Sequence, residues 1–141
     1  MTIQTSAGPA TVDTPEGRPL LRLTNLTKHF PQFRQTLVKR PDKPVRAVDG
    51  ISFDVQPGQT VGLVGESGCG KSTAGRTLLR LLEPTAGTIE FEGRDITSVQ
   101  GAELRTLRRE MQMIFQDPYG SLNPRQTIGS IIAAPYDIQK I

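Results

Sequence analysis

VGLVGESGCGKST, at residues 61–73, joins an apolar run to a glycine-rich turn and then to Lys-Ser-Thr. The spacing of Gly65, four residues, then Gly70, Lys71 and Ser72 is typical of a loop between a buried strand and a helix, whose backbone N–H groups bind phosphate. Gly65, Gly68 and Gly70 permit positive φ angles and leave room for a phosphate beside the main chain. The sequence therefore predicts a phosphate-binding loop.

We expect the polar groups of this loop to have different roles. The Lys71 ammonium reaches the β- and γ-phosphates and has a catalytic role, while the Ser72 hydroxyl is a ligand for Mg²⁺. The N–H groups and the dipole of the following helix favour the same anion. We expect the phosphates to be bound by Gly65, Glu66, Ser67, Gly68, Cys69, Gly70, Lys71, Ser72 and Thr73. A glycine-rich turn that binds nothing remains an alternative interpretation. A dinucleotide-binding fingerprint is excluded, because its third glycine would fall at Thr73.

Length and composition indicate one globular domain at most, with 141 residues, 35% hydrophobic and 22% charged. The sequence has neither a run of 18 apolar residues nor a basic start followed by an apolar core, so we expect no membrane span and no secretory signal. The single cysteine, Cys69, excludes an internal disulfide and suits a reducing compartment.

The net charge of +3 is concentrated in a basic run over residues 28–46. A solvated loop is the favoured interpretation. Because neither interleaved aromatic residues nor a base-reading motif accompanies the run, we expect no nucleic-acid partner. His29 is the single histidine, so a metal site built from several histidines is not supported.

The rest of the chain alternates strand and helix patterns after a flexible tail at residues 1–19, which is rich in Gly, Pro, Ser and Thr. Expected strands cover 20–23, 51–55, 60–64, 88–92 and 111–115, and expected helices cover 71–82, 102–110 and 127–134. Residues 31–44 are expected to form a long connection. Pro57 and Gly58 predict a type II turn that joins 51–55 and 60–64 as a hairpin.

These patterns favour an α/β fold in which 60–64 and 111–115 are buried strands. In doubly wound sheets ligands bind beyond the carboxyl ends of parallel strands, which would bring Gln116 and Asp117 near the phosphates. Phe30, ahead of the loop, is either a core residue or an aromatic that stacks on a nucleotide base. The residues alone leave both interpretations open.

At this point the chain resembles the N-terminal part of the ATP-binding subunits of ABC transporters. The resemblance is carried by VRAVDGISF at 45–53, the loop at 65–73 and QDPYGSLNPR at 116–125, which are similar to the oligopeptide, dipeptide and nickel importer group. It covers residues 20–141. It implies a P-loop NTPase fold, with an antiparallel β subdomain and a parallel core that these residues only begin.

The resemblance also implies roles and partners. Phe30 would stack on adenine, residues 65–72 would be the Walker A loop, and Gln116 would be the catalytic glutamine that meets Mg²⁺ and the attacking water. Residues 119–125 would couple to the membrane subunit. The implied cofactors are ATP and Mg²⁺. The implied partners are a second ATP-binding subunit, the same or different, and transmembrane permease subunits, with the protein peripheral on the cytoplasmic face of the inner membrane.

The chain departs from the family pattern in three respects. Counterparts are missing for the Leu-Ser-Gly-Gly-Gln signature, for an apolar strand ending in Asp-Glu, and for the later switch histidine. Asp117 does not replace the Walker B aspartate, because Gln116 interrupts the apolar run and Pro118 occupies the carboxylate position. We therefore expect the front portion of a longer domain, with weak nucleotide binding and negligible hydrolysis on its own.

Two other classes of function remain as alternatives. A small GTPase would use residues 117–120 as its Asp-x-x-Gly switch, although the Asn-Lys-x-Asp guanine motif is missing. A non-catalytic docking protein would bind a membrane partner through residues 119–125.

Overall fold

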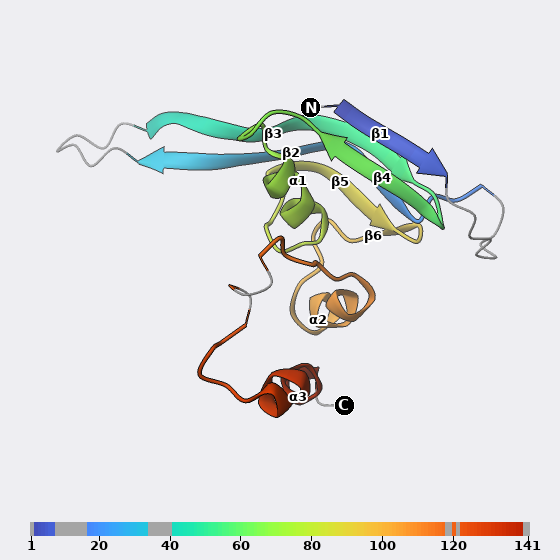
Figure 1. Ribbon diagram of the computed structural model, residues 1–141. Coiled ribbons are helices and arrows are strands. Elements are labelled where there is room, and N and C mark those ends of the chain that lie inside the picture. Colours follow the sequence, from blue (N-terminus) through green and yellow to red (C-terminus); the bar gives the residue numbers. More distant parts are fainter. Residues whose placement is uncertain (1, 8–16, 34–40, 118–119, 121, 140–141) are drawn as a thin grey trace. The chain divides into compact units, whose positions relative to one another are not determined.

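The computed structural model describes residues 2–7, 17–33, 41–117, 120 and 122–139. By their contacts they fall into two units, Met1–Met111 and Gln112–Ile141. The first unit carries every strand of the described residues and two helices, and the second carries one helix (Figure 1).

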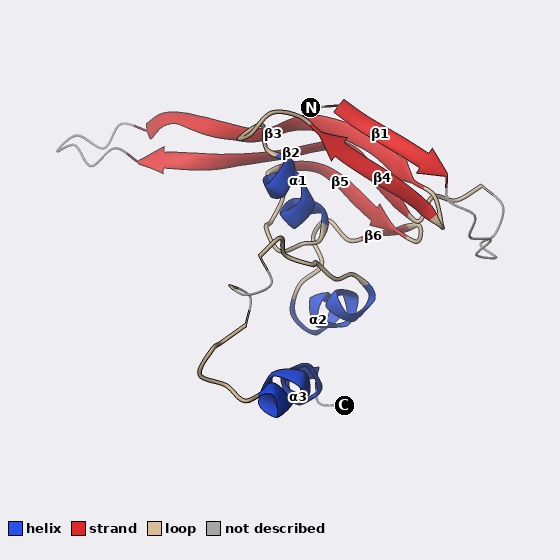
Figure 2. Cartoon of the chain, viewed as in Figure 1, coloured by secondary structure: helices blue, strands red, loops and turns tan. Residues whose placement is uncertain are grey.

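The larger sheet of the first unit has four strands in the order β3-β2-β5-β6, each antiparallel to its neighbours. They are β2 (Leu21–Phe33), β3 (Pro41–Val55), β5 (Ala86–Phe91) and β6 (Arg94–Asp95). Figure 2 shows β2 and β3 as the long pair of arrows. They extend into residues 31–33 and 41–44, where the sequence predicts a connection; residues 34–40 lie outside the described part.

The core of this unit lies where β2 and β5 meet α2 (Gly101–Glu110). Its buried residues are Leu21, Leu23, Leu26, Ile89, Ile96, Val99 and Leu107. Each large apolar side chain buried in this way contributes roughly 1.5–3 kcal/mol. The helix predicted at 102–110 is confirmed as α2: Leu107 is buried, Leu104 packs against the core, and Arg105 is exposed.

A second, two-stranded sheet pairs β1 (Thr2–Ala7) antiparallel with β4 (Gln59–Val64). The prediction of a flexible tail over residues 1–19 is therefore wrong for residues 2–7, while residues 8–16 lie outside the described part. The edge of β4 offers unpaired N–H and C=O groups, and β1 satisfies them. Composition does not reveal such a partner. Burial along β4 alternates instead of covering both faces, and Val64 is 47% exposed.

The predicted hairpin between 51–55 and 60–64 is also wrong. The turn itself forms, since the Gln59 N–H donates to the Gln56 carbonyl at 3.0 Å and Gly58 has a φ of +70°. However, β3 pairs with β2 and β4 pairs with β1, in different sheets. A turn brings two strands into one hairpin only if their edges do not pair with other strands. Here β3 pairs with β2 along its length as far as Val55.

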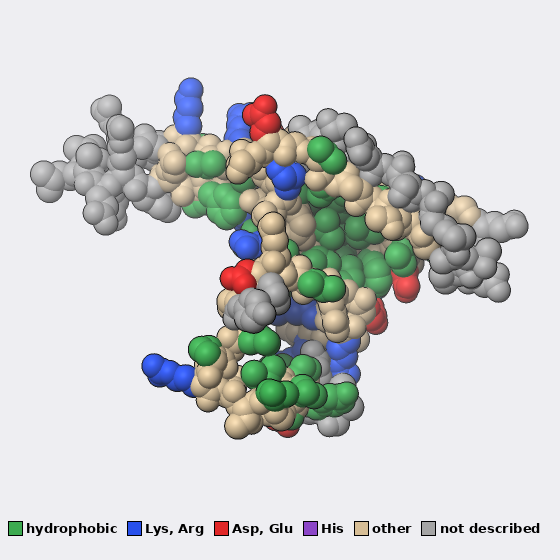
Figure 3. All heavy atoms as spheres, in the orientation of Figure 1, with side chains coloured by type: hydrophobic (Ala, Val, Ile, Leu, Met, Phe, Trp, Pro, Cys, Tyr) green, Lys and Arg blue, Asp and Glu red, His purple; other side chains and the backbone are tan. Residues whose placement is uncertain are grey.

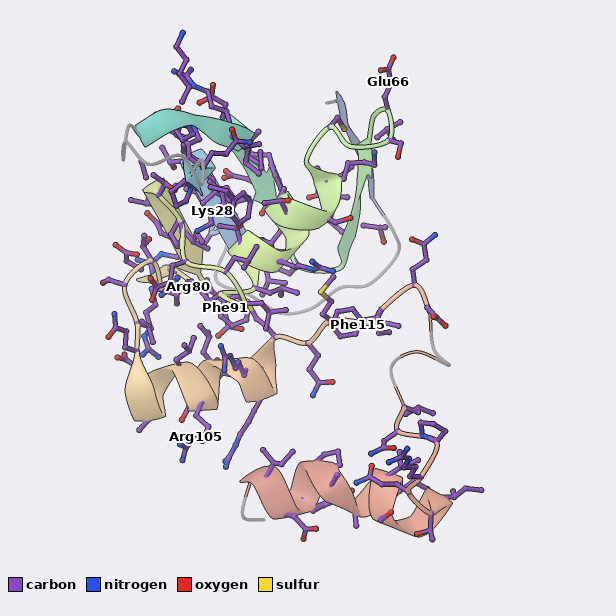
Figure 4. All side chains as sticks on the ribbon, turned by 90° about the vertical axis from the view of Figure 1, so that its left-hand side faces the viewer. Lys28, Glu66, Arg80, Phe91, Arg105 and Phe115 are labelled. Atoms are coloured by element: carbon purple, nitrogen blue, oxygen red, sulfur yellow. The ribbon has the colours of Figure 1, made fainter. Side chains whose placement is uncertain are left out.

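The helix after the loop, α1 (Lys71–Leu78), is shorter than the predicted 71–82. Its C-cap is Leu79, and Arg80 has a φ of +55°, which breaks the helix. Helical periodicity continued over 71–82 would place Arg80 off the apolar stripe, but Arg80 is 4% exposed and donates from Nη2 to the Val99 carbonyl at 3.1 Å. Figure 4 labels Arg80 between the sheet and α2.

In the second unit, the predicted strand at 111–115 is wrong. Residues 112–115 have no regular structure, and Ile114 is 96% exposed. Every strand pair among the described residues is antiparallel. These residues therefore do not form the parallel strands with which the core was expected to begin. A central parallel strand needs neighbours on both edges, and an apolar run alone does not provide them.

The helix of the second unit, α3 (Ile128–Gln139), contains Pro135, where the sequence predicts that the helix ends. Proline lacks one backbone N–H, and here the helix continues without that bond. Ile128, Ile132 and Tyr136 are 78%, 64% and 59% exposed at a spacing of four residues. Figure 3 shows apolar side chains gathered on this helix. Within the described residues, every helix is too short or too polar to span a bilayer.

Candidate functional site

The phosphate loop of the sequence lies between β4 and α1, as predicted. Within it, positive φ angles occur at Gly68 (+81°) and Gly70 (+95°), not at Gly65. Gly70 is the N-cap of α1, and no side chain caps this helix end. The first helical bond runs from the Ala74 N–H to the Gly70 carbonyl at 2.8 Å. The N–H groups of the first turn therefore point out of the helix, as an anion site requires.

Gly70 also fixes the loop against the larger sheet. A methyl group at this position would come within 1.9 Å of the Ala47 carbonyl oxygen and 3.9 Å of a Val48 methyl. Only glycine allows this approach with a left-handed φ. The helix N-terminus is thus held beside β3.

The Lys71 ammonium lies across the loop. It donates to the Gly65 carbonyl at 2.7 Å and to the Glu66 carbonyl at 2.5 Å, and it lies 3.5 Å from Cys69 Sγ. Glu66 itself is exposed and points outward (Figure 4). A positive charge is therefore held at the place where the motif predicts the phosphates, next to the uncapped helix end.

The remaining loop side chains are accessible. Ser67, Cys69 and Ser72 are exposed, and Thr73 is half-buried with its carbonyl accepting from Thr77 Oγ1 at 2.7 Å. The Ser72 hydroxyl fits Mg²⁺, which takes one or two protein oxygens and completes its shell with water and phosphate oxygens. Among the residues that the structure describes, no group of three His, Cys, Asp or Glu could hold a metal by itself.

Phe30 lies on β2 opposite Val45 of β3, and both are partly exposed, at 36% and 44%. Val45 is two residues from Ala47, or about 7 Å along a strand, and Ala47 contacts Gly70. The β2–β3 pair therefore brings Phe30 to the region of the phosphate loop. The core interpretation of Phe30 does not fit an exposure of 36%.

Two residues beside Phe30 were missed by sequence reasoning. Lys28 holds its Nζ 5.1 Å from the centroid of the Phe30 ring, and Val45 is the cross-strand neighbour of that ring. The sequence signal for Lys28 is its spacing of two from Phe30, which puts both side chains on one face of a strand. No signal existed for Val45, because residues 31–44 were expected to be a connection that leaves the register open.

A small charged cluster flanks this aromatic. His29 Nε2 lies 3.3 Å from Asp49 Oδ1, and Arg46 Nη1 donates to Asp49 Oδ2 at 3.2 Å. The hydrogen bond from His29, followed by that from Arg46, lowers the pKa of the exposed Asp49 carboxyl. The His29 N–H donates to Thr85 Oγ1 at 3.0 Å. These bonds anchor β2 between Lys28 and Phe30.

Gln116 and Asp117 belong to the second unit. Gln116 is exposed, and Asp117 Oδ1 accepts from the Gly120 N–H at 3.1 Å. The role of Gln116 as a catalytic and Mg²⁺-binding residue stays a prediction. Of the segment at 119–125 expected to couple to a membrane subunit, residues 119 and 121 lie outside the described part.

The model of the ABC transporter family matches residues 48–140. The chain belongs to the ABC transporter family. The phosphate loop and α1 therefore lie within an ABC ATP-binding domain, which is a P-loop NTPase, and the fold class predicted from the sequence is confirmed at that level. The expected resemblance to peptide importer subunits is also confirmed.

Two relatives within the ABC transporter family are similar over most of the chain. The oligopeptide transport ATP-binding protein AppF of Bacillus subtilis (strain 168) is 51% identical over 119 residues, which is 84% of this chain and 36% of AppF. The glutathione import ATP-binding protein GsiA of Escherichia coli (strain K12) is 52% identical over 120 residues, 85% of this chain and 19% of GsiA. The chain thus spans about a third and a fifth of their lengths.

Among solved structures, a bacterial Atm1-family ABC exporter with ATP bound matches 71% of this chain and 16% of its own chain. The sequence identity is 30% and the TM-score is 0.40.

Proposed function

We propose that this chain is the nucleotide-binding front part of an ABC importer subunit, and that it binds ATP with Mg²⁺ through residues 65–73 and Phe30. The observation that carries the proposal is the Lys71 ammonium held across a loop that ends at the uncapped N-terminus of α1. A cation, free N–H groups and a helix dipole at one place favour a polyphosphate.

The exposed ring of Phe30 supports adenine as the base. Stacking is available at an aromatic face that is not buried in the core, and the β2–β3 register supports a position near the loop. The Ser72 hydroxyl would hold Mg²⁺ at the phosphates when the ion is bound, and Mg²⁺ would neutralise charge on their oxygens. Gln116 would orient the attacking water in the longer protein.

The relatives support an importer for peptides or a similar small solute. AppF is named for oligopeptide transport and GsiA for glutathione import. In the longer protein, β4 would belong to a parallel core, and a second ATP-binding subunit, the same or different, would complete the site. Transmembrane permease subunits would bind through residues 119–125, with the protein peripheral on the cytoplasmic face of the inner membrane.

Binding of ATP to the 141-residue chain, measured with Mg²⁺ by calorimetry or with a fluorescent analogue, tests the proposal. Lys71→Ala should weaken binding about 10- to 100-fold, because a hydrogen bond to a charged group contributes roughly 1.5–3 kcal/mol. Lys43→Ala is the matched control: it removes an exposed lysine of β3 and should leave binding unchanged. A folded chain with no ATP binding at millimolar concentration would contradict the proposal.

Two further measurements separate the alternatives. GTP should compete with ATP no better than ATP itself, whereas a GTPase would prefer guanine strongly. Steady hydrolysis by the 141 residues alone should be negligible, because this sequence lacks an apolar strand ending in Asp-Glu. Turnover by the pure chain that Lys71→Ala abolishes would overturn the second expectation.

A further inference from the structure

We propose that Lys28 is a positioning residue of the base site: its ammonium holds the Phe30 ring by one face and leaves the other face for the purine. This inference rests on the proposed function. It adds a residue and a contact that neither the phosphate-loop motif nor its spacing predicts.

The contact itself is the first observation. Lys28 Nζ lies 5.1 Å from the centroid of the Phe30 ring, within the range of about 6 Å over which a ring face attracts a cation. Lys28 is half-buried and Phe30 is 36% exposed. Lys28 is therefore the more covered of the two residues, and the ring of Phe30 is the more accessible one.

The face of the sheet is the second observation. Lys28 and Phe30 are two residues apart on β2, so their side chains stand on one face. The cross-strand partner of Lys28 is Val48, which is 4% exposed, and directly opposite residues of an antiparallel pair share a face. A methyl group of Val48 lies 3.9 Å from where a Cβ of Gly70 would be. The Lys28–Phe30 contact therefore stands on the face that carries the phosphate loop.

The backbone between the two residues is held in place. His29 donates its N–H to Thr85 Oγ1 at 3.0 Å, and its ring bonds to Asp49 at 3.3 Å on the neighbouring strand. With the strand fixed, the ammonium decides the orientation of the exposed ring. A ring ordered before the base arrives loses less side-chain freedom on binding, which improves affinity without a new contact to the nucleotide.

Affinities for ATP and for tripolyphosphate, measured by calorimetry on the 141-residue chain, test the inference. Lys28→Met should weaken ATP binding about two- to fivefold, the effect of losing an exposed cation–π contact, and leave tripolyphosphate binding unchanged. Lys28→Arg should restore ATP binding, since a guanidinium also binds a ring face. Lys43→Met removes the same charge from an exposed site of β3 and should change neither affinity.

A double-mutant cycle with Phe30→Ala separates positioning from a purely structural role. In the Phe30→Ala background, Lys28→Met should have no further effect on ATP binding, because there is no ring left to orient. Circular dichroism establishes that each variant is folded.

Three outcomes would overturn the inference alone. The first is unchanged or tighter ATP binding by Lys28→Met, which would mean that the ammonium occupies the ring face needed by the base. The second is an equal loss of ATP and tripolyphosphate binding, which would make Lys28 a phosphate ligand. The third is additive effects of Lys28→Met and Phe30→Ala in the cycle. A folded wild-type chain that binds neither ligand would overturn the proposed function and this inference with it.

Discussion

Gly70 packs directly on the backbone of Ala47, so closely that a methyl group at position 70 would lie 1.9 Å from the Ala47 carbonyl oxygen. This contact joins the end of the phosphate loop to the strand pair that carries Phe30. The two halves of the candidate site, which binds phosphates on one side and a base on the other, therefore depend on a single glycine.

Gly70→Ala should destabilise the chain and weaken ATP binding at least tenfold. A left-handed φ costs a non-glycine residue roughly 1–2 kcal/mol, and the clash with the Ala47 carbonyl adds to it. Urea unfolding and ATP titration measure the two effects. The matched control is Gly75→Ala within α1, where open space surrounds the new methyl and helix propensity should add up to ~1 kcal/mol of stability. Equal stability of both variants would contradict the packing argument.

Alkylation of Cys69 should block ATP binding by bulk. The thiol is exposed and lies 3.5 Å from the Lys71 ammonium, so an added group occupies the mouth of the loop. Treatment with a maleimide followed by ATP titration measures the loss, and saturating ATP should slow the modification. A Cys69→Ser chain given the same treatment should bind as before. If the alkylated chain bound ATP as well as the untreated chain, the position of Cys69 in the site would be wrong.

Replacing Arg80 with methionine should raise the free energy of unfolding by ~1 kcal/mol. Arg80 is 4% exposed, and its Nε and Nη1 have no hydrogen-bond partner among the described residues. A buried charge without full compensation is costly, whereas methionine fills a similar volume without one. Urea unfolding of Arg80→Met and of the core variant Leu107→Ala gives the comparison, since the second should lose ~2–5 kcal/mol. A loss of stability in Arg80→Met would contradict this account.

Acid should destabilise the chain partly through Asp54. Arg22 donates to both carboxylate oxygens of Asp54, at 3.0 Å from Nε and 2.9 Å from Nη2, and this hydrogen bonding lowers the pKa of Asp54. The folded pKa is thus below the unfolded value of about 3.9. The stabilising contribution is therefore complete above that unfolded value and is lost as the pH falls through the folded pKa.

Unfolding measured between about pH 5 and 2 should show a shallower decline for Asp54→Asn than for the wild type, and Arg22→Gln should flatten the same part of the curve. The difference should be small, because both side chains are more than a third exposed and solvent screens the pair. Parallel curves for all three proteins would show that this ion pair has no part in acid unfolding.

The sequence predicted what depends on neighbouring residues in the chain. The loop at 65–73, the start of α1 at Lys71 and the apolar side of α2 all follow from local spacing, glycine and helical periodicity. The pairing of the strands could not be predicted from the sequence, because the apolar pattern of one strand does not determine which other strand it pairs with. Hence β4 pairs with β1 and not with β3 as expected, and residues 112–115 form no strand.

Within the candidate site the same limit applies. Lys71 and the glycines were identified by their motif, and the positions of Phe30 and Val45 came only from the register between β2 and β3. The burial of Arg80 was missed because the end of α1 at Leu79 rotates the following residues out of helical phase.

The helix that follows the loop is fastened at both ends. Gly70 lies against β3 at its start, and just beyond its end the Arg80 carbonyl accepts from Arg108 Nη2 of α2 at 3.3 Å. Such a helix has little freedom to tilt, so the loop acquires its shape when the chain folds and not when a ligand arrives. Association with a nucleotide should then be fast and accompanied by little reorganisation, with the entropy of ordering these residues already spent during folding.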